Sequence, residues 1–254
     1  MSESKSKPPQ FGPSREFFDS AIATYGRQGA QEISQSILDS LQYAYDVLPM
    51  KAPIIGLGLA VEAVDIAPQL PGGAPVIQFF ATHKTKAIEL FMHPQATVAD
   101  ILDNMRDGML HECAHIAHKQ HNPKFSVGSR AAGIRHFADA VTEGIAQVAE
   151  DFHDTDFAEM VVPYHPLVIE SKDDAELNMV NMALRDTLQD AHPELDSYAF
   201  LYGDEAFPHR GYEVGKYVVL NVMAAENCSL EYLMGKPLNE YRDFAEGLVR
   251  EAAA

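Results

Sequence analysis

The spacing of apolar residues predicts two helices near the start of the chain. Between residues 14 and 48, apolar side chains such as Phe17 and Ile33 recur at roughly the period of one helix face. Gly26 interrupts this pattern, and Gly29 follows three residues later. We therefore expect a break near these two glycines, with one helix on each side of it.

A block rich in Ile, Val and Phe comes next and predicts a small sheet. Such β-branched and aromatic runs, separated by turn-forming residues, are typical of strands. The runs cover residues 53–66, 74–80 and 87–92, and the segment PQLPGG at residues 68–73 makes a turn between the first two. A mainly antiparallel sheet is the simplest arrangement of three such strands.

The rest of the chain has helical periodicity almost throughout. Thr97 is a suitable N-cap for a helix that opens at Val98 and runs towards His118. Gly108 lies inside this helix and weakens the expectation that it is unbroken. Further helices are expected at residues 131–152, 173–190, 211–227 and 237–252. A small sheet followed by a mostly helical second half indicates an α+β fold.

Composition and charge limit the organisation and the partners of the chain. Residues 1–13 are rich in Ser, Lys and Pro and are expected to be frayed, whereas residues 14–254 form one domain with lobes at roughly 14–125 and 126–254. Asp and Glu total 37 against 19 Lys and Arg, a formal net charge of −18. This charge repels nucleic acid and anionic lipid, so neither is an expected partner. With two cysteines and no apolar signal segment, the chain is expected to be cytoplasmic.

The sequence HECAH at residues 111–115 carries the clearest candidate chemistry. In a helix, residues four positions apart lie on one face about one turn apart, so His111 and His115 can hold one metal ion between them. Two imidazole nitrogens suit Zn²⁺, and Glu112 can reach a metal-bound water without being a ligand. If both histidines are instead ordinary surface residues, this spacing on a predicted helix is a coincidence. Cys113, between the ligands, is expected to be a small packing residue.

Two residues compete for the place of third metal ligand. His121 fits the metzincin pattern HExxHxxGxxH at every position except the glycine, where His118 stands. If the helix continued without a turn there, His121 would lie about 15 Å along the axis from His111. Glu143, on the next predicted helix, needs no strained turn and is the gluzincin solution. The missing glycine favours Glu143, and His118 and His121 are then expected to be polar residues at the helix end.

Three sequence blocks taken together resemble one family. HECAH is followed by TEGIAQ at residues 142–147 and by FPHRGYEVGKYVV at residues 207–219. In this order they look like a family of bacterial proteins predicted to be zinc-dependent proteases, over roughly residues 53–246. The TEG block is also similar to the NEG block of gluzincin aminopeptidases. The resemblance implies a single zincin-like catalytic domain in which a small sheet packs on the HExxH helix.

The resemblance also implies roles for individual residues. It assigns Zn²⁺ to His111, His115 and Glu143, and the role of catalytic base to Glu112. The phenol of Tyr212, in the late GYxxG block, would hydrogen-bond the developing oxyanion. An aromatic residue packed into the core at the start of a helix is an equally good reading of Tyr212.

The chain departs from the gluzincin pattern beside the metal ligands. Where those enzymes have an Asp four residues after the ligand Glu, this chain has Gln147, whose amide raises the basicity of an imidazole less than a carboxylate does. Asp139, one turn before the ligand Glu, could substitute but is expected to be a solvated surface charge. His209 and Arg210 are weaker candidates than Tyr212 for oxyanion stabilisation.

These residues predict a zinc-dependent hydrolase that cleaves a peptide or small amide with metal-activated water, Glu112 being the general base. An extended peptide is expected to add to the edge of the strand at residues 87–92. The alternative is a specialised biosynthetic metalloenzyme that acts on a small molecule, with zinc or another divalent metal such as Fe, Mn or Co. A zinc-bearing binding module without turnover is disfavoured, because a structural site has no need of Glu112.

Overall fold

The computed structural model describes residues 14–54, 56–62, 77–82, 87–125, 134–151, 174–204 and 207–252. The predicted frayed start at residues 1–13 and the predicted turn at residues 68–73 lie outside these ranges. The chain divides into two compact units, Met1–Gln120 and His121–Ala254.

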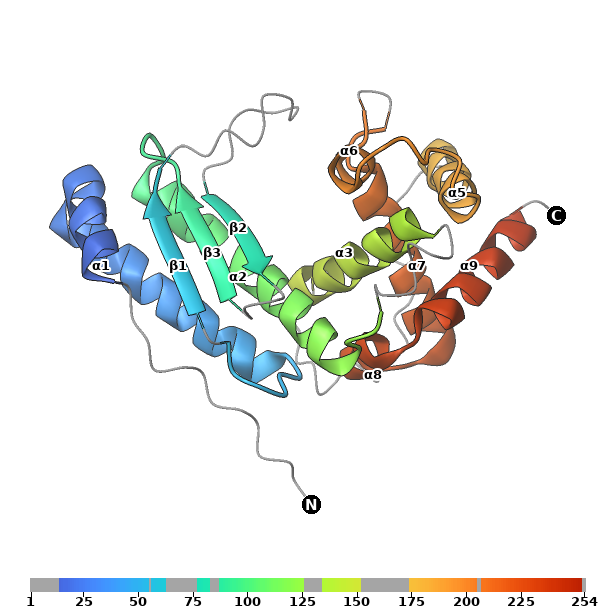
Figure 1. Cartoon of the computed structure of the whole chain (residues 1–254), viewed down its shortest axis with the longest axis horizontal. Helices are drawn as coiled ribbons and strands as arrows, with labels where there is room; N and C mark the ends of the chain where they lie inside the picture. Colours follow the sequence, from blue (N-terminus) through green and yellow to red (C-terminus); the bar gives the residue numbers. More distant parts are fainter. Residues whose placement is uncertain are drawn as a thin grey trace, which may run out of the picture. The chain divides into compact units, whose positions relative to one another are not determined.

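The first unit contains a long helix, α1 (Arg15–Val47), that is interrupted at a glycine. The hydroxyl of Ser14 caps it by accepting a hydrogen bond from the backbone N–H of Phe17 at 3.1 Å. Gly26 has φ 75° and ψ 167°, a conformation that residues with a Cβ rarely adopt. The two helical segments on either side of it are visible in Figure 1. The predicted pair of helices is confirmed, with the break at Gly26 and with Gly29 inside the second segment.

Three strands form the sheet of the first unit, in the order β1–β3–β2. They are β1 (Gly56–Val61), β2 (Ile77–Thr82) and β3 (Ala87–Met92). β3 pairs in parallel with β1 and antiparallel with β2, so the expectation of a mainly antiparallel sheet is corrected to a mixed one. The physical reason is the central place of β3. The chain reverses direction from β1 to β2 and again from β2 to β3, which leaves β1 and β3 parallel.

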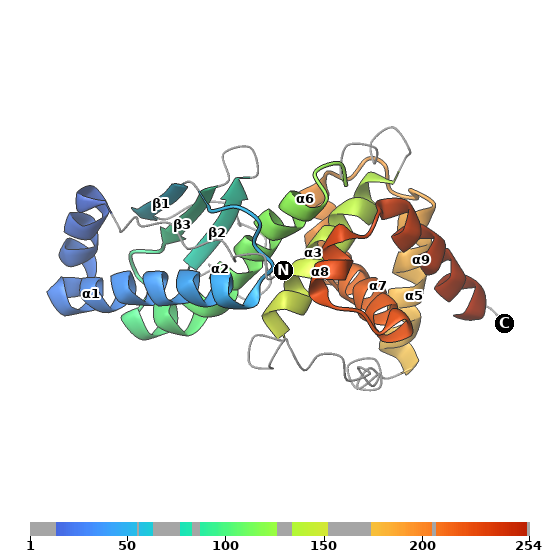
Figure 2. The ribbon, with the colours of Figure 1, turned by 90° about the horizontal axis from the view of Figure 1, so that it is seen from below.

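One face of this sheet is turned towards the core of the unit. On β3, Ile88, Leu90 and Met92 are buried, whereas Glu89 between them is exposed. α1 and α2 (Val98–His121) both lie on one side of the sheet (Figures 1 and 2). Because both edges of β3 are paired, no extended peptide can add to it, and the predicted docking edge at residues 87–92 is wrong.

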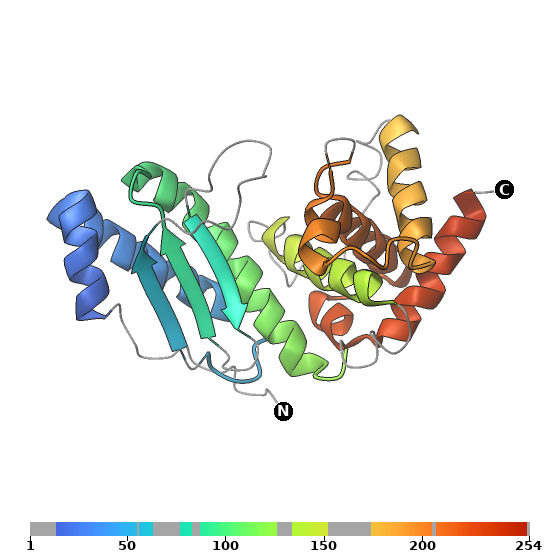
Figure 3. The ribbon, with the colours of Figure 1, turned by 45° about the horizontal axis from the view of Figure 1, so that its top comes forward.

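The second unit contains helices and no named strand among its described residues. They are α3 (Arg135–Asp151), α5 (Asp174–Leu188), α6 (Ser197–Tyr202), α7 (Arg210–Glu226), α8 (Leu230–Gly235) and α9 (Leu238–Ala252). α7 contacts α3, α5, α6 and α9 and so forms the centre of the unit (Figure 3). The helices expected in this half are confirmed. The short α6 and α8 escaped prediction because fewer than two helical turns carry too little periodicity to recognise.

The elements of both units establish the predicted α+β class, with a small sheet and a mostly helical second half. Among the helices described, none combines the length and the apolar character needed to cross a lipid bilayer.

Candidate metal centre

α2 carries the HECAH motif and is continuous along its whole length. The hydroxyl of Thr97 accepts a hydrogen bond from the backbone N–H of Asp100 at 3.1 Å, so the predicted N-cap is confirmed. Gly108 does not break the helix. The ring of Phe79 from β2 packs so closely against it that a Cβ there would lie 2.2 Å from ring carbon Cε2. Gly108 is thus a point at which α2 contacts the sheet, about one turn before His111.

His111, Glu112 and His115 are brought together as predicted, and they form the one candidate metal-binding group among the described residues. One ligand atom from each lies within 4.8 Å of the others. The two imidazole rings meet edge to face, with their centroids 4.6 Å apart. Glu112 and His115 are 8% and 7% exposed, whereas His111 is half-buried. The three side chains therefore form a largely desolvated group on one helix.

His111 and His115 of this group offer two imidazole nitrogens, which suit zinc, and Glu112 adds a carboxylate beside them. Imidazole nitrogens and carboxylate oxygens are the usual ligands of zinc together with thiolate. Two ligands of one tetrahedral Zn²⁺, each about 2.1 Å from the ion, lie about 3.4 Å apart. The 4.8 Å limit exceeds this separation by little more than about an ångström, so small side-chain rotations would bring the two imidazole nitrogens to a shared ion.

Cys113 lies between the two histidines in sequence but belongs to the core. It is fully buried. Burial, together with the nearby carboxylate of Glu112, raises the pKa of its thiol well above the ordinary value. The thiol is therefore protonated at neutral pH and acts neither as a ligand nor as a nucleophile. The expectation of a packing residue is confirmed.

His118 differs from the polar helix-end residue that the sequence suggested. It lies within α2 and is only 3% exposed, because the helix runs on for another turn and this face is covered. It lies seven positions after His111, so it shares the helix face of the His111–His115 pair. The spacing of the three histidines, at positions 111, 115 and 118, is the sequence signal that could have revealed that His118 lies on this face.

His121 does not meet the requirement of the metzincin pattern. That pattern needs the chain to leave the helix sharply at position 118, yet α2 stays helical up to His121. His121 therefore lies about 15 Å along the axis from His111, too far to share a metal ion with it. The structure thus removes the main competitor of Glu143 without itself testing Glu143.

The other two motif blocks meet each other inside the second unit. A Cβ on Gly144 of α3 would lie 2.2 Å from the carbonyl carbon of Gly215 of α7, and a Cβ on Gly215 would lie 1.8 Å from the carbonyl oxygen of Ala140. Only glycine permits this backbone-to-backbone crossing. Since these glycines belong to the TEG and GYxxG blocks, the crossing explains why both blocks contain them. It also places Glu143 and Tyr212 on two helices in direct contact.

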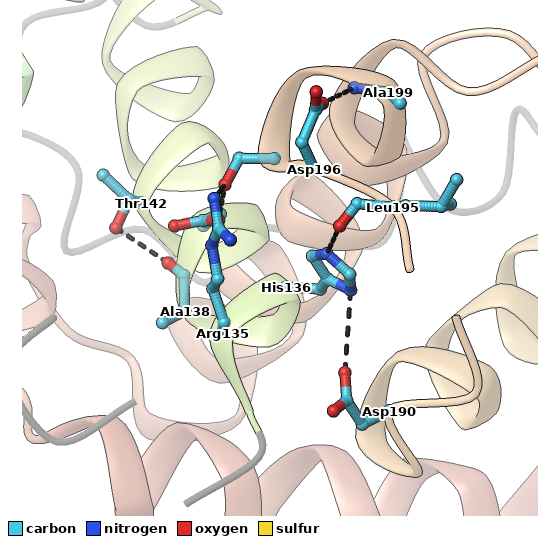
Figure 4. A network of polar contacts seen from close by, with 10 residues as sticks. Arg135, His136, Ala138, Thr142, Asp190, Leu195, Asp196 and Ala199 are labelled. Carbon is cyan, nitrogen blue, oxygen red and sulfur yellow. Dashed lines mark hydrogen bonds and ion pairs between the residues drawn. The ribbon is translucent and has the colours of Figure 1, made fainter. Parts of the chain in front are cut away.

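Asp139 is not the solvated surface charge that was expected. Its carboxylate accepts a hydrogen bond from the hydroxyl of Ser197 at 2.6 Å, and Arg135 donates to the same hydroxyl at 2.6 Å. Burial raises the pKa of Asp139, and the Ser197 hydrogen bond and the Arg135 charge oppose that rise. This network, drawn in Figure 4, connects the start of α3 to α6. The carboxylate is engaged because α6, which the sequence did not reveal, covers it.

His136 makes a second connection at the start of α3, also visible in Figure 4. Its Nε2 lies 3.0 Å from the carbonyl oxygen of Leu195, and its Nδ1 lies 3.7 Å from a carboxylate oxygen of Asp190. The ring stacks on Phe200 with centroids 4.5 Å apart. His136 is thus a buried histidine with its contacts made inside the protein, and it anchors the first turn of the helix that carries Glu143.

Gln147 follows Glu143 by one turn of α3. Its Oε1 atom is buried, and within the described residues no donor forms a hydrogen bond with it. A buried acceptor of this kind costs about 1–3 kcal/mol if it stays unsatisfied. The predicted role of Gln147, to accept the N–H of a ligand histidine, requires such an acceptor and stays a prediction.

Comparisons of the chain with protein-family models, with curated proteins and with solved structures found no match. The resemblance to zinc-dependent proteases therefore depends on the motif residues alone. Glu143 and Tyr212 belong to the second unit and the HECAH residues to the first, so their joint action at one metal ion also stays a prediction.

Proposed function

We propose that the protein is a zinc-dependent hydrolase whose metal is held by His111, His115 and Glu143. The observation that carries this proposal is the group formed by His111, Glu112 and His115, with ligand atoms within 4.8 Å of one another. The spacing of this group along α2 is that of a catalytic zinc helix. A structural zinc site would have no use for a carboxylate in the place of Glu112.

Glu112 is the proposed general base. When bound, Zn²⁺ would lower the pKa of a water molecule and polarise the carbonyl of the substrate. Glu112 takes a proton from the attacking water and returns it to the leaving amine. Because Glu112 is only 8% exposed, competing bulk water has little access to its carboxylate during this transfer.

Glu143 and Tyr212 complete the proposed site from the second unit. The contact between Gly144 and Gly215 gives α3 and α7 little room to slide, so the residues beside it are held on rigid elements. Glu143 acts as the third metal ligand. Tyr212 donates its phenolic hydrogen to the developing oxyanion, where one donor contributes about 3–4 kcal/mol.

The substrate class proposed here is a peptide or a small amide. Among the described strands, β2 pairs on one edge only and contacts α2 through Phe79 and Gly108, one turn before His111. An extended peptide that added to the outer edge of β2 would run beside the motif helix. β2 therefore replaces β3 as the proposed docking strand.

A specialised metalloenzyme that acts on a small molecule is the second candidate, with zinc or another divalent metal. The burial of Glu112 and His115 favours it, because exposures of 8% and 7% leave a bulky polypeptide little access. Cleavage of a peptide library, followed by mass spectrometry, separates the two candidates. Broad cleavage supports a protease, whereas a metal-loaded protein that cleaves no peptide supports the small-molecule enzyme.

Metal analysis of the purified full chain tests the proposed ligands. The wild type is expected to retain about one zinc ion per chain, and His115→Ala and Glu143→Ala are expected to lose most of it. His121→Ala removes a histidine from the same helix and is the matched control that keeps the metal. A wild type without stoichiometric metal, or a metal-loaded His115→Ala variant, would refute the centre. A metal-loaded Glu143→Ala variant would remove Glu143 alone.

Glu112→Gln separates metal binding from chemistry. The amide preserves size and helix but cannot accept the proton, so turnover should fall by about 10²- to 10⁴-fold while the zinc content is unchanged. The measurement is single-turnover hydrolysis of the best library substrate. Undiminished turnover would remove Glu112 from its role as base, and loss of zinc would make it a ligand instead.

A further inference from the structure

Four aromatic side chains gather where α6 meets the start of α7. The ring centroid of Tyr202 lies 4.4 Å from that of Tyr198, 5.9 Å from that of His209 and 5.5 Å from that of Tyr212. These four residues, here called the aromatic cluster, are not core residues. Tyr198 is 40% exposed, His209 is exposed, and the other two are half-buried. Burial of apolar surface therefore does not account for the cluster.

His209 occupies a backbone position that suits other residues better. It has φ 57° and ψ 29°, in the left-handed region, and it is the N-cap of α7 without making a side-chain capping bond. Glycine would relieve the strain, and Asn would tolerate the conformation. Strained positions that neither packing nor capping explains are concentrated at functional sites. Among the described residues, the ring of His209 contacts the rings of Tyr202 and Tyr212, so its side chain belongs to the cluster.

Hydrogen bonds and an ion pair fix the backbone of His209 and the residues next to it. The backbone N–H of His209 donates to the carbonyl oxygen of Tyr202 at 2.6 Å. The carboxylate of Asp204 accepts a hydrogen bond from the N–H of Phe207 at 3.0 Å and pairs with Arg210 at 2.7 Å. The rings are consequently in place before a ligand arrives, which reduces the entropy lost on binding.

The chemistry of the cluster favours a planar cation. The faces of tyrosine rings attract cations, and a guanidinium stacks on them more readily than a strongly hydrated ammonium does. The positive charge of Arg210 is neutralised by Asp204, and Glu213 lies in the first turn of α7. The formal net charge of −18 further raises the local concentration of cations.

From these observations we infer that the aromatic cluster binds the guanidinium group of an arginine side chain in a peptide ligand. The cluster belongs to the second unit alone, and it includes Tyr212, the proposed hydrogen-bond donor of the hydrolytic site. Binding of a guanidinium by these rings requires neither a metal ion nor hydrolysis, so the inference can be tested apart from the proposed function.

NMR titration of the full chain, with ¹³C-labelled tyrosine rings, tests this inference with N-acetyl-arginine amide as the probe. Saturable shifts are expected for Tyr198, Tyr202 and Tyr212. N-acetyl-citrulline amide has the same shape without the charge and should bind about fivefold or more weakly. Tyr232, 51% exposed in the same unit, is the internal control whose signal stays in place. Absence of saturable shifts in the cluster, or equal affinity for both probes, would overturn the inference.

Two variants distinguish binding from a structural role. Tyr198→Leu removes the most exposed ring and should weaken probe binding about two- to fivefold, whereas Tyr232→Leu should leave it unchanged. His209→Asn removes the ring from the cluster but suits the left-handed backbone, so it should raise the Tm while weakening binding. Unchanged binding in Tyr198→Leu, or a lowered Tm in His209→Asn, would show that these side chains serve the fold rather than a ligand.

Discussion

Gly108 of α2 and Gly215 of α7 both lie inside long helices, where glycine is less favourable than every residue but proline, yet they face different neighbours. At Gly108 the space of a Cβ is occupied by the ring of Phe79, 2.2 Å away. At Gly215 it is occupied by the carbonyl oxygen of Ala140, 1.8 Å away. A half-buried ring can tilt, whereas a packed backbone moves only if its whole helix moves. The first unit therefore has an adjustable contact and the second a fixed one.

This difference bears on the proposed metal centre. His111, Glu112 and His115 are neighbours because of the helical repeat, whatever the sheet does. Glu143 and Tyr212 come from separate helices, and the glycine crossing decides how those helices approach. The two motif blocks of the second unit thus combine structural glycines with the proposed ligand and hydrogen-bond donor.

Gly215→Ala is expected to have the largest effect on stability. The new methyl group would overlap the carbonyl oxygen of Ala140, so α3 and α7 must separate, and the free energy of unfolding should fall by about 3 kcal/mol or more. Urea denaturation followed by circular dichroism measures it. Gly247→Ala in α9 is the matched control: nothing lies within 4 Å of the new Cβ, so stability should rise by about 0.5–1 kcal/mol. A stable Gly215→Ala variant would disprove the close crossing.

Gly108→Ala should cost less, about 1–3 kcal/mol, because the ring of Phe79 can move aside. Phe79→Leu should recover part of that loss when the two substitutions are combined, since both act on the same contact. A double-mutant cycle of unfolding free energies measures the coupling. If the two effects simply add, the ring does not pack on Gly108.

Gly29→Ala should change stability least among the three glycine substitutions that meet a close neighbour. A Cβ there would lie 2.8 Å from Cγ2 of Val98, a methyl group that can shift, and alanine favours the helix. We expect a change of about 1 kcal/mol or less in either direction, measured by the same urea denaturation. If Gly29→Ala lowered the free energy of unfolding as much as Gly215→Ala does, a close side chain would be no easier to displace than a close backbone.

The smallest expected effect is a pH dependence at Asp139. Because burial raises its pKa in the folded state, this carboxyl contributes stability at low pH that is lost as the pH rises through the raised value. Asp139→Asn should therefore gain stability relative to the wild type at neutral pH. That gain should shrink as the pH falls towards about 4, near the unfolded pKa. Denaturant unfolding of both proteins across this range measures it, and a gain that grows towards low pH would contradict the assignment.

Local features of the fold could be predicted from the sequence. The strand at residues 87–92 and the cap at Thr97 occur where expected, because strand periodicity and capping chemistry act within a few residues. The order of the strands could not be predicted. Turn residues indicate that the chain reverses, but they do not decide which strand lies in the middle, and that choice made the sheet mixed.

The candidate site divides in the same way. By itself the sequence determined that His111 and His115 share one face of a helix, with Glu112 next to the first of them, since four residues make about one turn. Only the tertiary structure decided that His118 is buried, that Phe79 packs on Gly108 and that Gly215 touches the backbone of α3. Burial and close approach depend on how segments distant in the chain pack together. The sequence of one segment alone does not show which other segment packs against it.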